Sequence, residues 1–254
     1  MRIAVAGGTG VVGRQAVREL QARGHEVVVL ARSRGIDLRT GAGLDQALEG
    51  VGAVIDVSNT NTTRRGAAVA FFEAVTVRLQ AAEQRAGIGH HVALSIVGID
   101  KVPLGYYAGK LRQEQLCLAG GAVPATILRA TQFHEFPAQL LARMPPALPV
   151  VPIPVMRSQT VAAREVAASL VSAALASPAG RLPDLAGPQI EDMGELVRRV
   201  LQAQGRRRRV LPLRLPGRAG RGMADGSLIP GEDGPRGTLS FETWLASEDA
   251  REWL

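Results

Sequence analysis

Cysteine, lysine and aromatic residues are scarce in this chain of 254 residues. The single cysteine, Cys117, excludes a disulfide within the chain, and we expect a reducing, cytoplasmic environment. Cys117 falls in a helical pattern, so we predict a buried small side chain rather than a nucleophile. Aromatic residues make up 4% of the chain and hydrophobic residues 46%, so the core is expected to be large and mainly aliphatic.

Long apolar runs are also missing. No uncharged stretch is long enough to span a membrane, and no basic, apolar leader precedes the first predicted strand. We therefore expect neither a signal peptide nor a membrane partner.

Positive charge is in excess, with a net charge of +7, and all basic residues except Lys101 and Lys110 are arginine. Seven arginines lie between Arg206 and Arg221. Such a cluster could bind nucleic acid, but it partly alternates with apolar residues and contains no aromatic side chain for base stacking. We therefore predict a strand with one solvated or phosphate-facing side, and no nucleic-acid partner.

The most informative segment is the N-terminal run, in which an apolar stretch leads into Gly7, Gly10 and Gly13. A strand, a glycine turn and a helix in this order form a pocket for the pyrophosphate of a dinucleotide. Glycine permits a positive φ in the turn, leaves room for the phosphates and lets the helix pack against the strand. The free N–H groups of the first helical turn then bind the anion. A structural turn without a ligand is the alternative.

The residues after the second predicted strand, 25–30, decide which dinucleotide is preferred. An acidic side chain there would bind the ribose 2′-hydroxyl of NAD, whereas arginine would bind the extra phosphate of NADP. The chain has Arg32, Ser33 and Arg34 at this point and no acid before Asp37. A guanidinium group can bind phosphate through two hydrogen bonds, so we predict NADP(H), with Asp37 and Leu38 beside the adenine. Solvated arginines without a ligand are the alternative.

Strand and helix patterns alternate along the first half of the chain, which is typical of a parallel sheet with crossover helices. Further strands are predicted over 53–57, 91–97 and, as the sixth, 123–129. Helices are predicted over 43–49, 67–85, 109–118, 159–176, 193–204 and 241–254. Five prolines between 145 and 154 exclude a helix there.

The predicted architecture is a doubly wound α/β Rossmann fold. Residues 1–133 would form the NADP-binding core, and residues 134–254 would complete that core and form a small, loop-rich substrate lobe. Because open parallel sheets bind ligands at the carboxyl ends of their strands, we expect the substrate between the sheet and the lobe.

A second group of residues could carry proton transfer. Tyr106 and Lys110 lie four apart, so they share one face of a helix. A nearby ammonium lowers the pKa of a phenol, which would let the tyrosine give or take a proton near neutral pH. Ser95, at the end of the preceding strand, could donate a hydrogen bond to the reacting carbonyl. Tyr107 competes for the tyrosine's role, and two aromatics that merely anchor a loop are the alternative.

The four histidines offer no metal site. His90 and His91 have no carboxylate or thiol at ligand spacing. Phe133 and His134 follow the last strand of the predicted core, where they could contact the substrate, although a histidine that packs a loop is an equal alternative.

Together, the glycine turn, Arg32, Ser95 and the Tyr106–Lys110 pair resemble the short-chain dehydrogenase/reductase superfamily. They are most similar to its atypical NmrA-like, NAD(P)H-binding branch, which uses the spacing Gly-x-x-Gly-x-x-Gly. The segment 127–133 resembles the part of that branch that touches the nicotinamide half of the cofactor. Two positions depart from the branch: Ala130 replaces a common proline, and Glu165 replaces a frequent aspartate.

The resemblance implies a set of sites. Tyr106, Lys110 and Ser95 would be catalytic, and Phe133 and His134 would face the substrate. The residues implied in cofactor binding are Gly7, Gly8, Thr9, Gly10, Val11, Val12, Gly13, Arg32, Ser33, Arg34, Asp37, Leu38, Val57, Ser58, Asn59, Lys110, Ala130 and Thr131.

The leading functional hypothesis is an NADPH-dependent reductase of a small or medium, apolar carbonyl or quinone-like substrate, acting as a monomer or weak homodimer. The NmrA-like branch also includes non-catalytic NADP(H) sensors that regulate a partner protein, and these characteristically lack the tyrosine–lysine pair. Isomerase or dehydratase chemistry with a retained cofactor would use the same residues.

Overall fold

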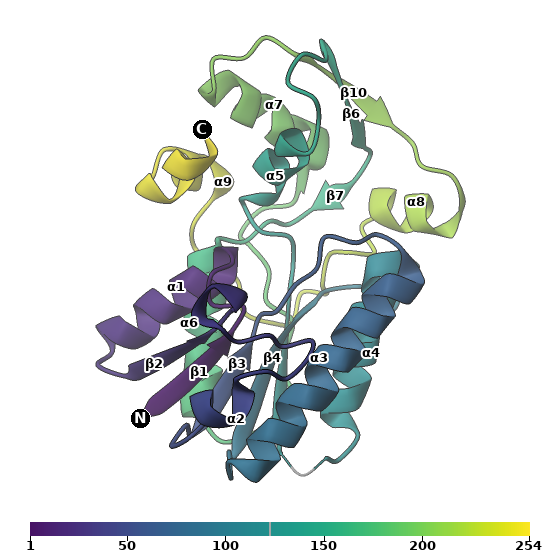
Figure 1. The fold of residues 1–254 in the computed structure, drawn as a ribbon. Coiled ribbons are helices and arrows are strands. Elements are labelled where there is room, and N and C mark those ends of the chain that lie inside the picture. Colours follow the sequence, from purple (N-terminus) through teal and green to yellow (C-terminus); the bar gives the residue numbers. More distant parts are fainter. Residues whose placement is uncertain (122) are drawn as a thin grey trace.

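A six-stranded parallel sheet forms the centre of the computed structural model, which describes residues 1–121 and 123–254 (Figure 1). The strand order is β2-β1-β3-β4-β5-β8, and every neighbouring pair is parallel. The strands are β1 (Arg2–Ala6), β2 (Glu26–Leu30), β3 (Ala53–Asp56), β4 (His90–Ile96), β5 (Ala125–Ala130) and β8 (Gly180–Arg181). The chain moves outward from β1 to β2 and then returns to β3 on the other side of β1. The carboxyl ends of β1 and β3 therefore border the crevice at which such sheets bind ligands.

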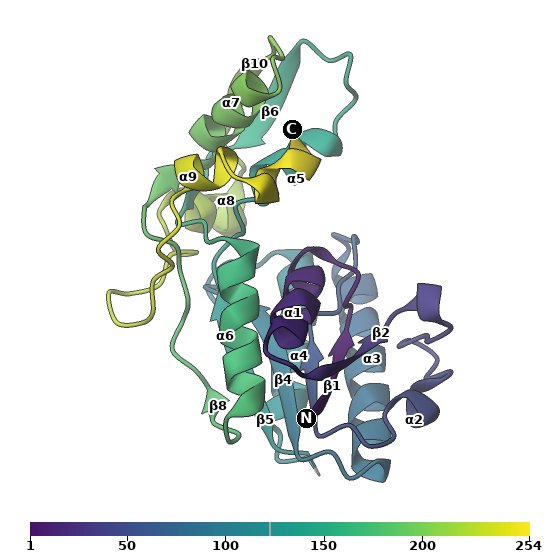
Figure 2. The same ribbon diagram turned by 90° about the vertical axis from the view of Figure 1, so that its left-hand side faces the viewer.

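Helices cover both faces of this sheet (Figure 2). Helices α1 (Val11–Ala22) and α6 (Ala163–Leu175) pack on one face, and α2 (Leu44–Ala47), α3 (Arg65–Arg85) and α4 (Gly105–Leu118) pack on the other. Strand alternation divides the buried side chains between the two layers. In β1, Ile3 and Val5 join the α1/α6 layer, whereas Ala4 and Ala6 join the α2/α3 layer.

A second lobe lies beyond the carboxyl ends of the strands (Figures 1 and 2). Strand β6 (Val150–Pro154) pairs in parallel with β10 (Arg209–Leu213), and β7 (Arg157–Ser158) pairs in antiparallel fashion with β9 (Glu191–Asp192). The lobe's helices are α5 (Phe136–Ala142), α7 (Met193–Ala203), α8 (Gly217–Ala224), α9 (Phe241–Leu245) and the 3-10 helix η2 (Glu248–Trp253).

The lobe has its own hydrophobic core, separate from the two layers of the sheet. Phe241 and Trp244 of α9 are almost completely buried there, against the apolar face of α7 and against Val151 and Ile153 of β6. The chain crosses between the two cores more than once, because α6 and β8 return to the sheet between lobe segments. The expected α/β fold with a parallel sheet and Rossmann topology is confirmed.

Several predicted elements differ from those observed. The helix predicted over 159–176 begins only at Ala163. The strand predicted over 123–129 as the sixth is the fifth in chain order and begins at Ala125. The helix predicted from residue 109 begins at Gly105, so it contains both tyrosines. The C-terminal helix is divided into α9 and η2 at Ser247, where the backbone is extended and the hydroxyl donates to the Trp244 carbonyl.

Although no carboxylate lies at metal-ligand spacing from the paired histidines in the sequence, His91 has a carboxylate partner from another element. Its Nδ1 lies 2.8 Å from Oε1 of Glu83 on α3, and both side chains are fully buried. Burial by itself lowers the pKa of His91, but the Glu83 carboxylate and the nearby Cys117 thiol outweigh it and raise that pKa well above 6.5. This contact links α3 to the sheet. It could not be predicted from residue spacing in the sequence, because it joins two different elements. Cys117 itself is buried, as predicted.

Among the described residues, no helix has both the length and the apolar character needed to cross a membrane.

Candidate dinucleotide and proton-transfer site

The glycine turn brings three backbone segments into contact at the carboxyl end of β1. Gly7 has a φ of +79°, and a Cβ added to it would lie 2.8 Å from the Val57 carbonyl oxygen. A Cβ on Gly13 would lie 2.2 Å from the Gly7 carbonyl oxygen. Any side chain at either position would push α1 away from β1 or push the loop after β3 away from the turn. The two glycines are therefore required by the packing of the turn itself.

The N-terminus of α1 is open for an anion. Gly10 occupies the N-cap position, no side chain caps it, and no acidic residue stands in the first turn. Thr9 and Gly10 are exposed to solvent. Ser58 lies on the opposite wall of the crevice, and its buried Oγ has no hydrogen-bond partner among the described residues. A bound pyrophosphate needs hydrogen-bond donors and positive charge. The free N–H groups and the positive dipole end of α1 could supply these, together with the unpartnered hydroxyl of Ser58.

The segment after β2 carries the predicted 2′-phosphate residues. Arg32, Ser33 and Arg34 form a short 3-10 helix, η1 (Arg32–Arg34), in which all three side chains are exposed. Asp37 turns away from this helix, because its Oδ1 accepts a hydrogen bond from the Arg39 backbone N–H at 2.8 Å. Leu38 is half-buried and packs against the cluster formed by α2, α3 and β2. The arginines are thus available to a ligand, whereas Asp37 is engaged in its own turn.

Tyr106 reaches the same crevice from α4. Its hydroxyl donates a 2.7 Å hydrogen bond to Oδ1 of Asn59, which lies two residues beyond Val57 in the loop after β3. The predicted lowering of the Tyr106 pKa by Lys110 is wrong. Burial, helped by the neighbouring Tyr107, raises that pKa well above 10, so the phenol is protonated at neutral pH. Tyr107 is more deeply buried in the lobe core, and burial raises its pKa to about 12. Of the two tyrosines, Tyr106 is the one in contact with the loop that borders the glycine turn.

Lys110 is buried below Tyr106 rather than beside its hydroxyl. The ammonium donates a 2.5 Å hydrogen bond to Oε1 of Gln113 and lies 4.7 Å from the centre of the Phe72 ring. Gln113 in turn donates to Oδ2 of Asp56 at 2.8 Å. Burial lowers the pKa of Lys110 to about 8, against the opposing effect of Asp56. Within the described residues, no hydrogen bond joins Lys110 to Tyr106.

Asp56 and Gln113 were not among the residues singled out from the sequence. Asp56 ends β3 and is fully buried, and its Oδ1 also accepts from the Ser58 backbone N–H at 2.8 Å. It thereby ties Lys110, through Gln113, to the loop that contacts Gly7. The sequence did contain a signal for these contacts: an acidic residue inside the apolar run 53–57. A carboxylate in a buried strand requires hydrogen-bond partners.

Ser95 lies apart from this group. It is buried on the face of β4 that packs against α3 and α4, and its register partner on β5 is Arg129. Arg129 forms two hydrogen bonds with Glu114 of α4, at 2.7 and 2.8 Å. The structure thus places Ser95 beside a buried ion pair, with no hydrogen bond to Tyr106 among the described residues.

The residues after β5 are held within the protein. Ala130 is buried, and the Thr131 hydroxyl donates to the Gln159 carbonyl at 2.5 Å. His134 is 1% exposed; its Nδ1 pairs with the Thr160 hydroxyl and its Nε2 with the Leu239 carbonyl. Burial lowers the pKa of His134 to about 4, so the ring is neutral.

Phe133, by contrast, is only partly buried and packs against the α1/α6 layer. Glu165 holds the chain before α9, accepting from the backbone N–H groups of Thr238 and Leu239.

Comparison with known proteins supports this description. Residues 3–95 match the family model described as NAD dependent epimerase/dehydratase family. That stretch contains the glycine turn, η1 and β3. The expected resemblance to the short-chain dehydrogenase/reductase superfamily is confirmed.

Two solved structures share the fold over nearly the whole chain. MoeE5 in complex with UDP-glucuronic acid and NAD has a TM-score of 0.76 at 19% identity, with 100% of this chain and 98% of that chain covered. A short-chain dehydrogenase/reductase superfamily protein from Agrobacterium tumefaciens with bound NAD has a TM-score of 0.71 at 19% identity, with 98% and 96% covered.

One curated relative is more similar in sequence but over a shorter stretch. Photosystem II assembly factor Ycf39 from Synechocystis sp. is 33% identical over 126 residues, which is 41% of this chain and 36% of that protein. The match thus spans about a third of that relative's length. The chain resembles NAD(P)-dependent epimerase/dehydratase-type oxidoreductases, and its curated relative is named as an assembly factor.

Substituting Gly13 by alanine should damage both the fold and the ligand site. With the added Cβ so close to the Gly7 carbonyl, α1 must shift, at a cost of about 1–3 kcal/mol in the free energy of unfolding. We expect a lower melting temperature and at least tenfold weaker dinucleotide binding, measured by thermal unfolding and by fluorescence titration. Gly66→Ala is the matched control, because a Cβ there meets nothing within 4 Å. Equal binding by the two variants would contradict the assignment of the turn.

Proposed function

We propose that the protein is an NADPH-dependent reductase of a small or medium, apolar carbonyl or quinone-like substrate. The observation that carries this proposal is the position of the Tyr106 hydroxyl, 2.7 Å from Asn59 in the loop after β3. The same loop contacts the glycine turn, through Val57 and Ser58 against Gly7. The proposed proton donor and the glycine turn are therefore both in contact with the loop after β3.

The proposed reaction needs one hydride and one proton. NADPH, when bound, supplies the hydride to the acceptor carbon. The Tyr106 hydroxyl supplies the proton to the acceptor oxygen, exchanging its hydrogen bond to Asn59 for one to that oxygen. Burial keeps Tyr106 protonated at neutral pH, so the proton needed in the reductive direction is present. The raised pKa also makes the phenol a weaker acid, so its donation would require positive charge nearby to stabilise the phenolate. The phenolate left behind is then neutralised by a proton from solvent.

Lys110 would supply positive charge to this site. Its ammonium is held by Gln113 and indirectly by Asp56. It would have to leave Gln113 and turn toward Tyr106 to stabilise negative charge on the phenolate and the acceptor oxygen or to bind the cofactor's ribose.

The preference for NADPH rests on η1. Arg32 and Arg34 are exposed directly after β2, where an acidic residue would be needed for the ribose 2′-hydroxyl of NAD. The similar solved structures are described with NAD, so this preference would distinguish the chain from them.

The substrate would enter between the sheet and the lobe that carries α5, α7, α8 and α9. Tyr106 is partly buried and packs on the lobe core together with Ile96 and Leu104, so its surroundings are apolar. This supports an apolar acceptor rather than a charged one.

A non-catalytic sensor of NADP(H) that regulates a partner protein is the second candidate. The specific observation in its favour is the separation of Tyr106 from Lys110, whose ammonium is directed to Gln113 and is not hydrogen-bonded to the phenol. In this reading the tyrosine only anchors the loop after β3. The name of the curated relative, an assembly factor, agrees with a role in binding a partner.

Replacement of Arg32 and Arg34 together by alanine should weaken NADPH binding by about 10- to 100-fold, because charge-assisted hydrogen bonds to the 2′-phosphate are lost. Binding of NADH should stay the same, since it has no such phosphate. Titration calorimetry with both cofactors measures the difference. Arg39→Ala, an exposed arginine in the following turn, is the matched control. Equal losses for both cofactors, or tighter binding of NADH by the unaltered protein, would refute the preference.

Substitution of Tyr106 by phenylalanine should reduce turnover at least about a hundredfold while leaving the dissociation constant of NADPH unchanged. The assay follows NADPH oxidation with a panel of quinones, ketones and aldehydes. Tyr107→Phe is the matched control and should retain turnover, because its hydroxyl lies in the lobe core. Lys110→Ala should lower turnover and weaken cofactor binding as well.

The outcomes of this assay separate the two candidates. Tight NADPH binding without turnover of any acceptor would reject the reductase and favour the sensor. Turnover that survives in Tyr106→Phe and is lost in Tyr107→Phe would move the proton donor to the second tyrosine.

A further inference from the structure

The two-stranded ribbon of β6 and β10 exposes aliphatic side chains to solvent. Leu148 and Val150 are 42% and 38% exposed, and Leu211 and Leu213 are 53% and 44% exposed. Four of the ten large hydrophobic side chains exposed by the described residues are therefore in or beside this one ribbon. Such clustering on a small surface points to a contact with a partner.

The register of the ribbon places these side chains on one face. Val150 is paired with Arg209, and Leu211 and Leu213 are paired with Pro152 and Pro154. Side chains two residues apart in a strand share a face, so Arg209, Leu211 and Leu213 project together with Val150. The opposite face is represented by Val151 and Ile153, which are fully buried against the lobe core. One face of the ribbon thus packs against the lobe core. The other face, which carries the exposed side chains, has no partner within the described part of the chain.

Positive charge predominates around this face. Residues 196–224 contain nine arginines and no acidic residue, and residues 136–164 also contain no acidic residue. Arg198 forms an ion pair with Glu195 in the same helix, and Arg199 forms one with Glu191 of β9. The structure, as far as it is described, gives no ion pair to the remaining seven arginines, which are Arg206, Arg207, Arg208, Arg209, Arg214, Arg218 and Arg221.

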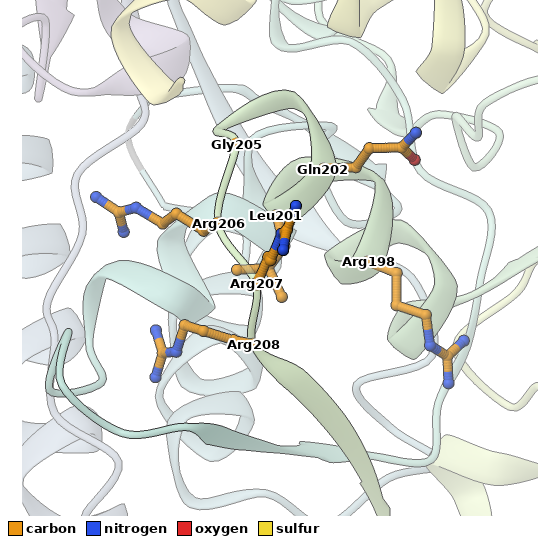
Figure 3. A pocket seen from close by; sticks show the side chains of 7 residues that line it. All are labelled: Arg198, Leu201, Gln202, Gly205, Arg206, Arg207 and Arg208. Carbon is orange, nitrogen blue, oxygen red and sulfur yellow. The ribbon is translucent and has the colours of Figure 1, made fainter.

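These arginines are spread along the ribbon rather than gathered into one pocket. A depression of about 430 Å³ lies at the start of β10, and around it the guanidinium groups of Arg198, Arg206, Arg207 and Arg208 point in different directions (Figure 3). A second depression of about 390 Å³ at the other end of β10 is lined by Arg214 and Arg221, together with one acidic residue, Asp225. Divergent cations fit an extended anionic surface better than a single small anion.

We propose that the exposed face of the β6–β10 ribbon binds peripherally to an anionic lipid surface. The leucines and Val150 would enter the interfacial region, and the arginines around them would contact lipid phosphates. The earlier expectation of no membrane partner rested on the absence of a spanning segment, which a peripheral contact does not need.

Other occupants fit the face less well. Single-stranded nucleic acid would stack on aromatic side chains, and the sequence has none between residues 198 and 240. A second copy of the chain would bring two sets of unpaired arginines together, which like-charge repulsion opposes.

The ribbon also lies at the end of the lobe that is distant from the glycine turn, so docking leaves the cofactor crevice open (Figures 1 and 2). The proposal therefore does not depend on the reductase activity.

Vesicle flotation tests the proposal with the full chain. The protein should float with vesicles that mix phosphatidylcholine and phosphatidylglycerol, and not with phosphatidylcholine alone. Arg206→Gln/Arg207→Gln/Arg209→Gln should weaken partition on the order of a hundredfold. Leu211→Ser/Leu213→Ser should weaken it about tenfold or more. All five side chains are exposed, and thermal unfolding confirms that the variants remain folded.

Two matched controls change the same chemistry elsewhere. Arg18→Gln/Arg65→Gln/Arg78→Gln removes equal charge from α1 and α3, and Val77→Ser/Leu118→Ser removes exposed aliphatic groups from α3 and α4. Both should float as the unaltered protein does. The proposal is overturned if the unaltered protein does not float, or if the controls lose partition equally. It is also overturned if single-stranded DNA or polyglutamate is bound through these arginines while anionic vesicles are not.

Discussion

The close approach of three backbone segments at the glycine turn is the constraint on which the rest of the structure depends. Gly13 lets α1 touch the Gly7 carbonyl, and Gly7 lets the loop after β3 touch the turn. These contacts fix the free N–H groups of α1 at the crevice beside β1 and β3. They also fix Asn59, and through it the Tyr106 hydroxyl. The anion site and the candidate proton donor are therefore positioned by one packing arrangement.

The molecule uses its buried charges to join elements around this crevice. Lys110, Gln113 and Asp56 connect α4 to the end of β3, and Glu83 with His91 connects α3 to β4. Removing one partner of a buried pair leaves an uncompensated group, so these contacts restrict how the helix layer can sit on the sheet. The lobe, by contrast, is held mainly by apolar packing around Phe241 and Trp244, which leaves its outer ribbon free for a separate role.

The sequence was sufficient for the features that depend on local pattern. Strand, turn and helix at Gly7–Gly13, the parallel sheet and the burial of Cys117 all follow from spacing and periodicity. The partners of the buried polar groups could not be predicted in this way, because each contact joins elements that are distant in the chain. The hydrogen bond between Tyr106 and Asn59 is an example. Strand alternation predicts that Ser95 shares a face with His91, but it does not say which helices cover that face. The division of the C-terminal helix depended on a single serine hydroxyl.

Hydrogen exchange of the backbone amides, with and without NADPH, tests whether a dinucleotide binds at the glycine turn. We expect slower exchange at residues 9–13 in the first turn of α1 and at residues 57–59 in the loop after β3. These are the segments whose N–H groups and packing a bound pyrophosphate would restrain. Unchanged exchange at the turn, with protection confined to the arginines at 206–209, would contradict it. That result would mean that the cofactor is bound merely as a polyanion on the lobe.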